Sequence, residues 1–504
     1  MAVTKDGIRA VDNRPDFPAL ERELLAWWES DKIVEKYLSR NAESPERYSF
    51  LDGPITANNP MGVHHAWGRT YKDLFQRYQT MLGKRQRYQN GFDCQGLWVE
   101  VEVEKDLGLK SKRDIEQFGI AEFVERCKQR VLTFADRITE QSIRLGYWMD
   151  WDNSYLTMSD ENNYTIWHFL KTVHERGWLY KGHDVMPWCP RCGTGISEHE
   201  IVTEGYQERA HLATYVAFPL EDEPGANLLV WTTTPWTLAA NVAAAVDPHL
   251  TYVRAEQDGR AYYVAKEAAR SALRGEFAIT REVSGADLIG RSYQGPFDEL
   301  SAQAEVDHRV IGWDDVDAAE GTGIVHIAPG AGKEDFALSK QHDLAVIAPI
   351  DEFGVYAEGF GALTGQYVHE VAVAIAEDLE QKGLLYRAEQ YRHRYPVCWR
   401  CSTDLVFRLV DEWFIAMDDL RQPMMDVTRQ IDWRPSFGLD RELDWLAHMD
   451  DWMISKKRYW GLALPIYECT ACGNVDVIGS EIELRNRAVE GWESFAGHTP
   501  HRPW

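Results

Sequence analysis

Two short cysteine motifs constrain the fold of this chain more than any other feature. PWCPRCGT (187–194) and PVCWRCST (396–403) share the form Cys-x-x-Cys followed by a small residue and threonine, and they stand at the two edges of a β-rich segment. Four thiolates around one zinc ion would tie the entry and exit strands of that segment together and close a very long loop. The alternative is two unrelated reduced pairs, but the matched flanks favour one zinc site. Its ligands would be Cys189, Cys192, Cys398 and Cys401.

The remaining cysteines divide into one pair and two single residues. Cys469 and Cys472 in YECTACGN form a third Cys-x-x-Cys with no partner pair left in the chain, so they either stay without metal or find their partners beyond Trp504. Cys94 and Cys127 are solitary and are expected to be core thiols. Paired thiols in a leaderless chain indicate metal binding in a reducing cytosol rather than disulfides.

Composition and charge exclude several classes of protein. Hydrophobic residues make up 44% of the 504 residues, which predicts a packed globular protein of two or three domains. We expect no membrane span, because the chain has no apolar run of about 18 residues. The N-terminus lacks an apolar signal region, so we expect a cytoplasmic protein. A net charge of −26 argues against non-specific DNA binding, but not against a nucleic acid held on a local basic patch.

The first part of the chain predicts a strand, loop and helix unit. FPALERELLAWWESDKIVEKYL (17–38) has apolar residues at helical spacing, and the short strand YSFLDGP (48–54) follows it. Beyond an Asn-, Pro- and Gly-rich loop, apolar residues recur at steps of mostly three and four from Trp67 to Leu82, which predicts a helix over 64–83. A strand, loop and helix in this order present backbone N–H groups to an anion.

The pattern changes from helical to β-rich near residue 205. Residues 114–181 are mostly helical in pattern, whereas short β-rich segments follow, with Asp258-Gly259 as a hairpin turn between two of them. Helical spacing returns over 369–385, and mixed patterning resumes after residue 400. The simplest architecture is an α/β domain interrupted by a β-rich insertion.

With these features in place, the chain resembles the N-terminal half, or slightly more, of a class I aminoacyl-tRNA synthetase, most closely the isoleucyl type. Segments that match the family occur in the family's order from residue 17 to the end. They include LDGPITANN, YKD, GFDCQGLWVE, WCPRCGT, WTTTPWTLAAN, GTGIVHIAPG, YPVCWRCST, ISKKRYWG and HRPW. The isoleucyl type is favoured by WTTTPWTL, by the histidine of GIVHIAP and by the cysteine of DCQG.

The resemblance implies a Rossmann-type catalytic domain interrupted by a β-rich editing insertion, the connective peptide. The expected domains are a helical segment (1–48), the first catalytic half with a zinc knuckle (49–204), the editing domain (205–388), and a second knuckle with the start of the second catalytic half (389–504). The implied activity joins isoleucine to ATP with Mg²⁺ and passes the aminoacyl group to tRNA(Ile). The implied protein is a monomer without membrane or DNA partners.

The resemblance also assigns residues to the adenylate-forming site. The family's His-x-Gly-His tetrapeptide lies at a helix N-terminus and holds the phosphates, and residues 62–65 occupy its place as Gly-Val-His-His. His65 keeps the last histidine, whereas Gly62 replaces the first and His64 stands where glycine is usual. Asp93 fits the family residue that meets the α-ammonium group of the amino acid.

Two further positions of this site depend on the same comparison. Pro54 is expected to shape the wall of the amino-acid pocket. Gln95 and Trp98 in DCQGLW replace the histidine and proline of the family's DCHGLP, which changes the local shape of the pocket.

The insertion is expected to carry a second active site. One methylene is worth only about 1–3 kcal/mol in an apolar pocket, a magnitude for which this type of enzyme is the standard example, so isoleucine and valine need a second, hydrolytic selection. The resemblance assigns to it the threonine strand, an asparagine, a pocket histidine and a carboxylate for the α-ammonium group of the wrong amino acid. These residues are Thr232, Thr233, Thr234, Asn241, His326 and Asp335.

One family signature is missing, which leaves two hypotheses. The Lys-Met-Ser-Lys-Ser loop that stabilises pyrophosphate does not occur, and the chain stops at HRPW, so we expect it to be an N-terminal portion. The first hypothesis is an isoleucyl-type ligase with editing. The second is a diverged or truncated paralogue that lacks synthesis and acts as a tRNA-binding or editing hydrolase module, which the changes at Gly62, Gln95 and Trp98 favour.

Overall fold

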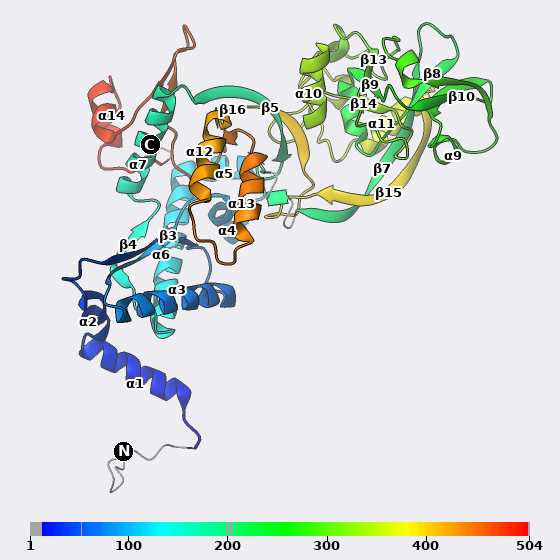
Figure 1. The fold of residues 1–504 in the computed structure, drawn as a ribbon. Coiled ribbons are helices and arrows are strands. Elements are labelled where there is room, and N and C mark those ends of the chain that lie inside the picture. Colours follow the sequence, from blue (N-terminus) through cyan, green and yellow to red (C-terminus); the bar gives the residue numbers. More distant parts are fainter. Residues whose placement is uncertain (1–12, 52, 198–199, 202–204, 502–504) are drawn as a thin grey trace. The chain divides into compact units, whose positions relative to one another are not determined.

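The structure is a computed structural model that describes residues 13–51, 53–197, 200–201 and 205–501. Asp52 of the predicted strand and the last three residues of HRPW lie outside the described residues. Two compact units make up the chain (Figure 1): the first comprises Met1–Arg176 and Arg458–Trp504, and the second comprises Gly177–Lys457.

The first unit is built on a parallel sheet. β1 (Arg47–Leu51) and β2 (Ile55–Thr56) pair in turn along one edge of β3 (Arg85–Asp93), and β4 (Asp150–Leu156) pairs along the other, all in parallel. Parallel neighbours require helical crossovers, which here follow β2 and β3. This is the Rossmann-type arrangement that the sequence predicts, and at its carboxyl edge such sheets bind ligands.

Helices surround this sheet in the order of the chain. They are α1 (Phe17–Ser30), α2 (Ile33–Ser39), α3 (Val63–Met81), α4 (Leu97–Leu107), α5 (Lys112–Phe118), α6 (Ile120–Arg144) and α7 (Asp160–Glu175). The helix predicted over 64–83 is confirmed as α3. The single helix predicted over 17–38 is wrong, because Lys32 adopts a left-handed conformation (φ 52°) that ends one helix before the next begins.

The mostly helical pattern predicted for 114–181 is only partly confirmed. It contains α5, α6 and α7, but also β4 and the start of β5 (Leu179–Cys189). β4 reads DWDNSYL and is half-buried at most positions, so it shows neither the alternation nor the apolar run by which a strand is identified.

The core of the first unit lies between α4 and α6. Val99 and Val103 pack with the apolar side of α6, and Cys94 and Cys127 are fully buried there, as the sequence predicts for solitary thiols.

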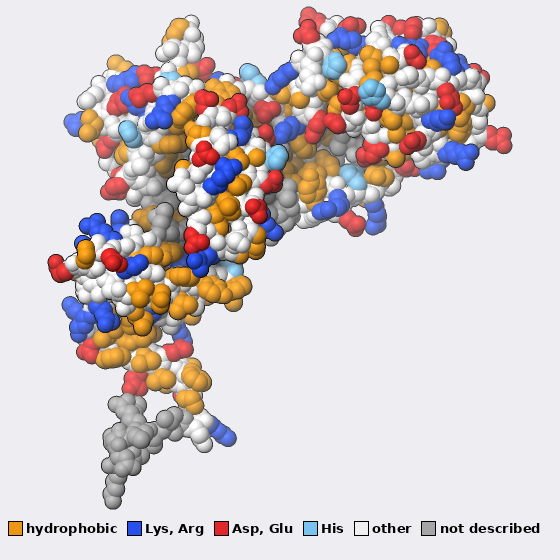
Figure 2. Space-filling model, in the orientation of Figure 1, with side chains coloured by type: hydrophobic (Ala, Val, Ile, Leu, Met, Phe, Trp, Pro, Cys, Tyr) orange, Lys and Arg blue, Asp and Glu red, His pale blue; other side chains and the backbone are white. Residues whose placement is uncertain are grey.

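Helix α3 is amphipathic in the reverse sense. Its buried residues are polar, namely Arg69, Asp73, Gln76 and Thr80. Its apolar residues, which predict the helix, are exposed, and Figure 2 shows hydrophobic side chains gathered over α3. Apolar spacing therefore identifies the helix without identifying its inward face.

The second unit contains the β-rich segment. Its largest described sheet has the order β12-β10-β11-β8-β7-β15. The strands are β7 (Tyr206–Pro219), β8 (Ala226–Thr232), β10 (Thr251–Gln257), β11 (Arg260–Ala265), β12 (Ala278–Ser284) and β15 (Leu385–Pro396). Asp258 (φ 50°) and Gly259 (φ 79°) form the predicted turn between β10 and β11.

Smaller elements complete this unit. β9 (Ala243–Val246) pairs with β13 (Arg309–Gly312) and β14 (Val325–Ile327), and β5 pairs with β16 (Val406–Ile415), β16 with β17 (Trp452–Met453), and β5 with β6 (Thr194–Gly195). The helices are the 3-10 turn η1 (Pro235–Ala240), α9 (Ala269–Ala272), α10 (Lys333–His342), α11 (Ala372–Gln381), α12 (Asp418–Thr428) and α13 (Gly438–Ala447). α11 confirms the helix predicted over 369–385.

The last segment of the chain belongs to the first unit. It contains the hairpin of β18 (Ile466–Glu468) and β19 (Val475–Val477), followed by α14 (Glu481–Arg487) and α15 (Trp492–Phe495). Across the described part of the chain, no helix combines the length and apolarity needed to cross a bilayer.

Candidate active sites and metal centre

The four cysteines that the sequence groups together lie close together in the second unit. Cys189 and Cys192 follow β5, while Cys398 and Cys401 follow β15, and their four sulfur atoms all lie within 4.8 Å of one another. The Sγ of Cys401 is 3.5 Å from that of Cys189 and 3.6 Å from that of Cys192. Four thiolates at a Zn–S distance of about 2.3 Å would be about 3.8 Å apart, so the site fits a tetrahedral zinc ion.

Both cysteine pairs have the same backbone geometry. The residue after each second cysteine has a left-handed φ of 59°, at Gly193 and at Ser402. Its N–H donates to the carbonyl of the first cysteine, over 2.8 Å to Cys189 and 2.7 Å to Cys398. The small residue in each motif therefore serves a turn that aims two thiols at one point.

The third pair folds in the same way but stands apart. The N–H of Gly473 (φ 70°) donates to the carbonyl of Cys469 over 2.8 Å, between β18 and β19. Cys469 and Cys472 are exposed, and among the described residues they belong to no group of three or more candidate metal ligands. This pair is a formed half-site.

The altered tetrapeptide begins helix α3. Gly62 is the N-cap, and its N–H donates to Nδ1 of His65 over 3.1 Å. The exposed ring of His64 lies beside that of His65, with centroids 3.9 Å apart. Burial lowers the pKa of His65, and His64 and Arg69 lower it further. A helix N-terminus with a neutral histidine and free outward space is suited to phosphate oxygens.

The loop that leads into α3 is held from α6. Arg130 donates from Nε to the Asn58 side chain over 2.7 Å and from a terminal nitrogen to the Asn58 carbonyl over 2.8 Å. Gln141 accepts from the N–H of Met61 over 2.8 Å. Neither residue was singled out in the sequence, because nothing in a helical pattern marks which polar side chain reaches a distant loop.

Asp93 lies at the carboxyl end of β3. Thr56 on the neighbouring strand β2 donates to its carboxylate over 3.0 Å, and Pro54 immediately precedes β2. Burial raises the pKa of Asp93, and the hydrogen bond from Thr56 opposes that shift. A half-buried carboxylate of this kind is ready to accept an ammonium group, whose charge would offset the cost of burial. Pro54, Asp93 and the start of α3 thus flank one loop.

Gln95 is fixed in the turn after β3. Its Oε1 accepts from the Thr157 hydroxyl over 2.7 Å, and its Nε2 lies 3.0 Å from Nε2 of His501. Trp98 is half-buried on α4, where its carbonyl accepts from Asn58 over 3.0 Å.

Trp460 is the residue of this site that the motif comparison missed. Its indole N–H donates to the carbonyl of Cys94 over 2.6 Å, and its ring stacks on His501 with centroids 5.1 Å apart. Both residues belong to matched segments, ISKKRYWG and HRPW, but sequence spacing does not show that they meet the Asp93–Gly96 turn.

A second cluster lies in the β-rich unit. The hydroxyls of Thr232 and Thr234 are 3.3 Å apart at the end of β8, and Thr233 between them is half-buried. Thr237 on η1 donates from Oγ1 to the Thr234 carbonyl over 2.8 Å, and the same oxygen lies 2.8 Å from Nε2 of His326. Thr237 was not predicted, although it lies in the quoted motif WTTTPWTLAAN.

The contact with Thr237 assigns the tautomer of His326. Since the Thr237 hydroxyl already donates to a carbonyl, it accepts here, so Nε2 of His326 carries the proton. Its Nδ1 is then a buried acceptor with no hydrogen-bond partner among the described residues. Burial lowers the pKa of His326 to about 4, so the ring is neutral near pH 7.

Asp335 closes the same cluster from the first turn of α10. Its carboxylate accepts from the N–H of Ala328, one residue beyond β14, over 2.7 Å. Burial raises its pKa to about 6, the hydrogen bond from Ala328 opposes the shift, and Glu334 adds to it. Asp335 is therefore no surface loop acid.

Asn241 has a supporting position in this cluster. It is fully buried, its amide donates to the carbonyls of Ala243 and Ile327, and its oxygen accepts from Tyr293 over 2.8 Å. These bonds hold β9 and β14 together beneath His326.

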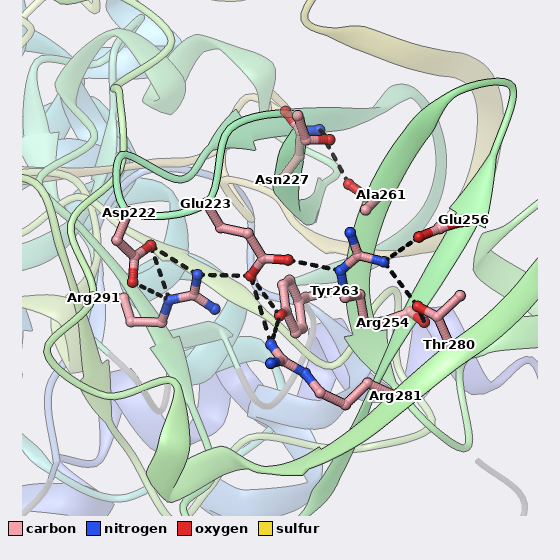
Figure 3. A network of polar contacts seen from close by, with 11 residues as sticks. Asp222, Glu223, Asn227, Arg254, Glu256, Ala261, Tyr263, Thr280, Arg281 and Arg291 are labelled. Carbon is pink, nitrogen blue, oxygen red and sulfur yellow. Dashed lines mark hydrogen bonds and ion pairs between the residues drawn. The ribbon is translucent and has the colours of Figure 1, made fainter.

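A polar network in the same sheet lies apart from these residues (Figure 3). Glu223 accepts from Arg254 over 2.7 Å, from Tyr263 over 2.8 Å and from Arg291 over 2.9 Å. Burial would raise its pKa, but these hydrogen bonds outweigh that effect and lower it to about 2. Every charge in the network is matched, so it ties strands together without offering a site.

Comparison with known proteins is consistent with this geometry. The family described as tRNA synthetases class I (I, L, M and V) matches residues 23–496. Similar curated proteins are the isoleucine–tRNA ligases of Clostridium tetani (37% identity, 98% of this chain, 47% of the relative) and Methanothermobacter marburgensis (39%, 96%, 46%). That of Thermus thermophilus is 40% identical over 97% of this chain and 47% of its own length. The chain thus spans about half the length of these relatives, and it belongs to the class I tRNA synthetases of the I, L, M and V family.

Proposed function

We propose that this chain carries the amino-acid-activating site and the editing site of an isoleucine–tRNA ligase. The observation that carries the proposal is the position of Asp93 and the start of α3 on either side of one loop at the carboxyl edge of the parallel sheet. The names of the relatives support isoleucine as the amino acid and tRNA(Ile) as the acceptor, and they give no support to a paralogue without synthesis.

In activation, the carboxylate of isoleucine attacks the α-phosphorus of ATP and pyrophosphate leaves. Asp93 binds the α-ammonium group, and Pro54 and Gln95 border the space for the amino acid. The N-terminus of α3, with His64 and His65, stabilises negative charge on the phosphates during the in-line displacement. Mg²⁺ bound to ATP neutralises part of the same charge. The aminoacyl group then passes from the adenylate to a hydroxyl at the 3′ end of the tRNA.

In editing, a water molecule attacks the ester carbonyl of valine attached to tRNA(Ile). Asp335 binds the ammonium group of the wrong amino acid, and Nδ1 of His326 accepts a hydrogen bond from substrate or water. Thr232, Thr233 and Thr234 supply hydroxyl and backbone groups to the ribose and the water, while Asn241 keeps the floor of the site in place.

We further propose one structural zinc ion on Cys189, Cys192, Cys398 and Cys401. Bound zinc would hold the four thiolates and so join the ends of β5 and β15. The exposed Cys469–Cys472 pair would supply half of a second site. All eight cysteines, each among the described residues, are free thiols, which supports a reducing, cytosolic compartment. We propose that the protein acts as a monomer, with domain bounds at 48/49, 204/205 and 388/389.

Two assays test the proposal. Purified chain should bind L-isoleucine in preference to L-leucine, and should support isoleucine-dependent ATP–pyrophosphate exchange if it contains all residues that the reaction needs. It should also deacylate Val-tRNA(Ile) but not Ile-tRNA(Ile). Absence of both isoleucine binding and deacylation in folded protein would refute the proposed function, and deacylation alone would leave the editing module.

A further inference from the structure

Glu100 on α4 is a fully buried carboxylate that binds backbone rather than only a cation. Its Oε1 accepts from the N–H of Tyr459 over 2.8 Å and from the N–H of Trp460. Its Oε2 accepts from Nε of Arg458. One side chain thus accepts from three successive residues that are more than 350 positions away.

Glu104, one turn along the same helix, makes a different contact. It is also buried and accepts from a terminal nitrogen of Arg458 over 2.6 Å. No hydrogen bond from Glu104 to the backbone of Tyr459 or Trp460 is described. The two glutamates therefore share a helix, a burial state and an arginine, and they differ in whether they hold the 459–460 backbone.

The segment that Glu100 holds ends at the amino-acid site. The carbonyl of Trp460 accepts from the N–H of Gly96 over 3.1 Å, and its indole N–H donates to the carbonyl of Cys94. Trp460 thus bonds on both sides of Gln95, within two residues of Asp93. Its ring also stacks on His501, which contacts Gln95.

We propose that Glu100 is a positioning residue for the amino-acid site: it fixes the backbone of Tyr459 and Trp460, and through Trp460 it sets the turn Asp93–Gly96. The inference rests on the proposed function, since that function makes the turn an amino-acid site. Glu100 touches no substrate. Its effect passes through the Trp460 side chain and backbone to Cys94 and Gly96.

A role in folding alone makes a different prediction. Glu100, Glu104 and Arg458 form a buried group with one net negative charge. Changing either glutamate to glutamine gives a neutral group and leaves Arg458 one carboxylate partner. If burial of charge were all that mattered, Glu100→Gln and Glu104→Gln would be equivalent. They differ only if the bonds to the 459–460 backbone have a role of their own.

The experiment compares Glu100→Gln, Glu100→Ala and Glu104→Gln in the full chain. Isoleucine dissociation constants are measured by calorimetry. Protein labelled with 5-fluorotryptophan is examined by ¹⁹F NMR, with the Trp460 signal assigned from Trp460→Phe. Thermal unfolding controls for stability.

We expect Glu100→Gln, which keeps an oxygen acceptor without the charge, to weaken isoleucine binding about tenfold, as for the loss of one charge-assisted hydrogen bond. Glu100→Ala should weaken it further, and both should shift the Trp460 signal. Glu104→Gln should leave binding within about twofold and the Trp460 signal in place.

Equal binding and equal Trp460 signals in the two glutamine variants would overturn the inference. If wild-type chain binds no isoleucine, the proposed function fails, but the Trp460 signal still decides whether Glu100 positions this segment. A shift in Glu100→Gln alone would then support the positioning role apart from the substrate. No difference between the variants would refute it.

Discussion

The imidazole of His64 occupies the space above Gly62. A Cβ built on Gly62 would lie 2.8 Å from Cε1 and 3.0 Å from Nδ1 of His64, closer than real Cβ contacts. The two changes in the tetrapeptide are therefore linked, since the missing first histidine makes room for the added third one. The altered signature still presents two imidazoles at the N-terminus of α3.

This relationship predicts the outcome of restoring the family's order of residues. Gly62→His alone should clash with His64 and reduce activation or isoleucine-plus-ATP binding by about 10-fold or more. The double variant Gly62→His/His64→Gly should recover most of that loss. The two positions should thus show a coupling free energy of about 1–3 kcal/mol in a double-mutant cycle. Additive effects would show that the two positions are independent.

Zinc content should depend on four particular cysteines. We expect about one zinc per purified chain by mass spectrometry of the metal, falling to near zero in Cys401→Ser. Cys469→Ser is the matched control, because its pair is exposed and has no described partner pair, and it should keep the same zinc content. A chelator should lower the melting temperature of wild type but not that of Cys401→Ser. Equal zinc loss in both variants would contradict the assignment.

The buried carboxylate of Asp335 makes stability and editing depend on pH. Its pKa rises from an ordinary 3.8 to about 6 in the fold, so the folded state binds the proton more tightly than the unfolded chain. The stability that protonation contributes is present below about pH 4 and lost as pH rises through about 6. Asp335→Asn should therefore unfold at a higher temperature than wild type at pH 8, by a free energy of up to about 3 kcal/mol, with little difference near pH 4.

Deacylation should follow the opposite trend in the same residue. Because the carboxylate binds an ammonium group, hydrolysis of Val-tRNA(Ile) should increase as pH rises through about 6, and Asp335→Asn should abolish it. A variant with full deacylase activity would remove Asp335 from the site.

Thr237 should be needed for editing because it sets the tautomer of His326. Thr237→Val removes the buried acceptor of the Nε2 proton, and we expect deacylation to fall about 10–100-fold while isoleucine binding is unchanged. Thr214→Val is the control: Thr214 is fully buried on β7 opposite Thr232, and its hydroxyl has no hydrogen-bond partner among the described residues. Equal losses in both variants would point to packing instead.

Local features of this chain were predictable because they depend on nearby residues. The Asp258-Gly259 hairpin follows from the two left-handed conformations that such a turn requires. The grouping of the cysteine pairs follows from a repeated turn, in which Gly193 and Ser402 have the same φ. Apolar spacing was enough to place helix α3.

Other features failed where sequence pattern and burial disagree. Strand β4 is short, polar and half-buried, so it was taken as part of a helical region. The break at Lys32 is a single left-handed residue without a glycine to mark it. The inward face of α3 is polar because Arg69 bonds to Asn90 on β3 and to Ser142 on α6, partners that no periodicity identifies.

The sequence by itself determined the family, the order of the two proposed sites and the residues that bear their chemistry, because these are properties of short ordered motifs. Only the tertiary structure decided which residues meet. Trp460 joins the turn beside Asp93, Thr237 orients His326, and Glu100 accepts from a segment 359 residues later in the chain. Hydrogen bonds of this range depend on distance in space, and nothing in a sequence of local propensities specifies that distance.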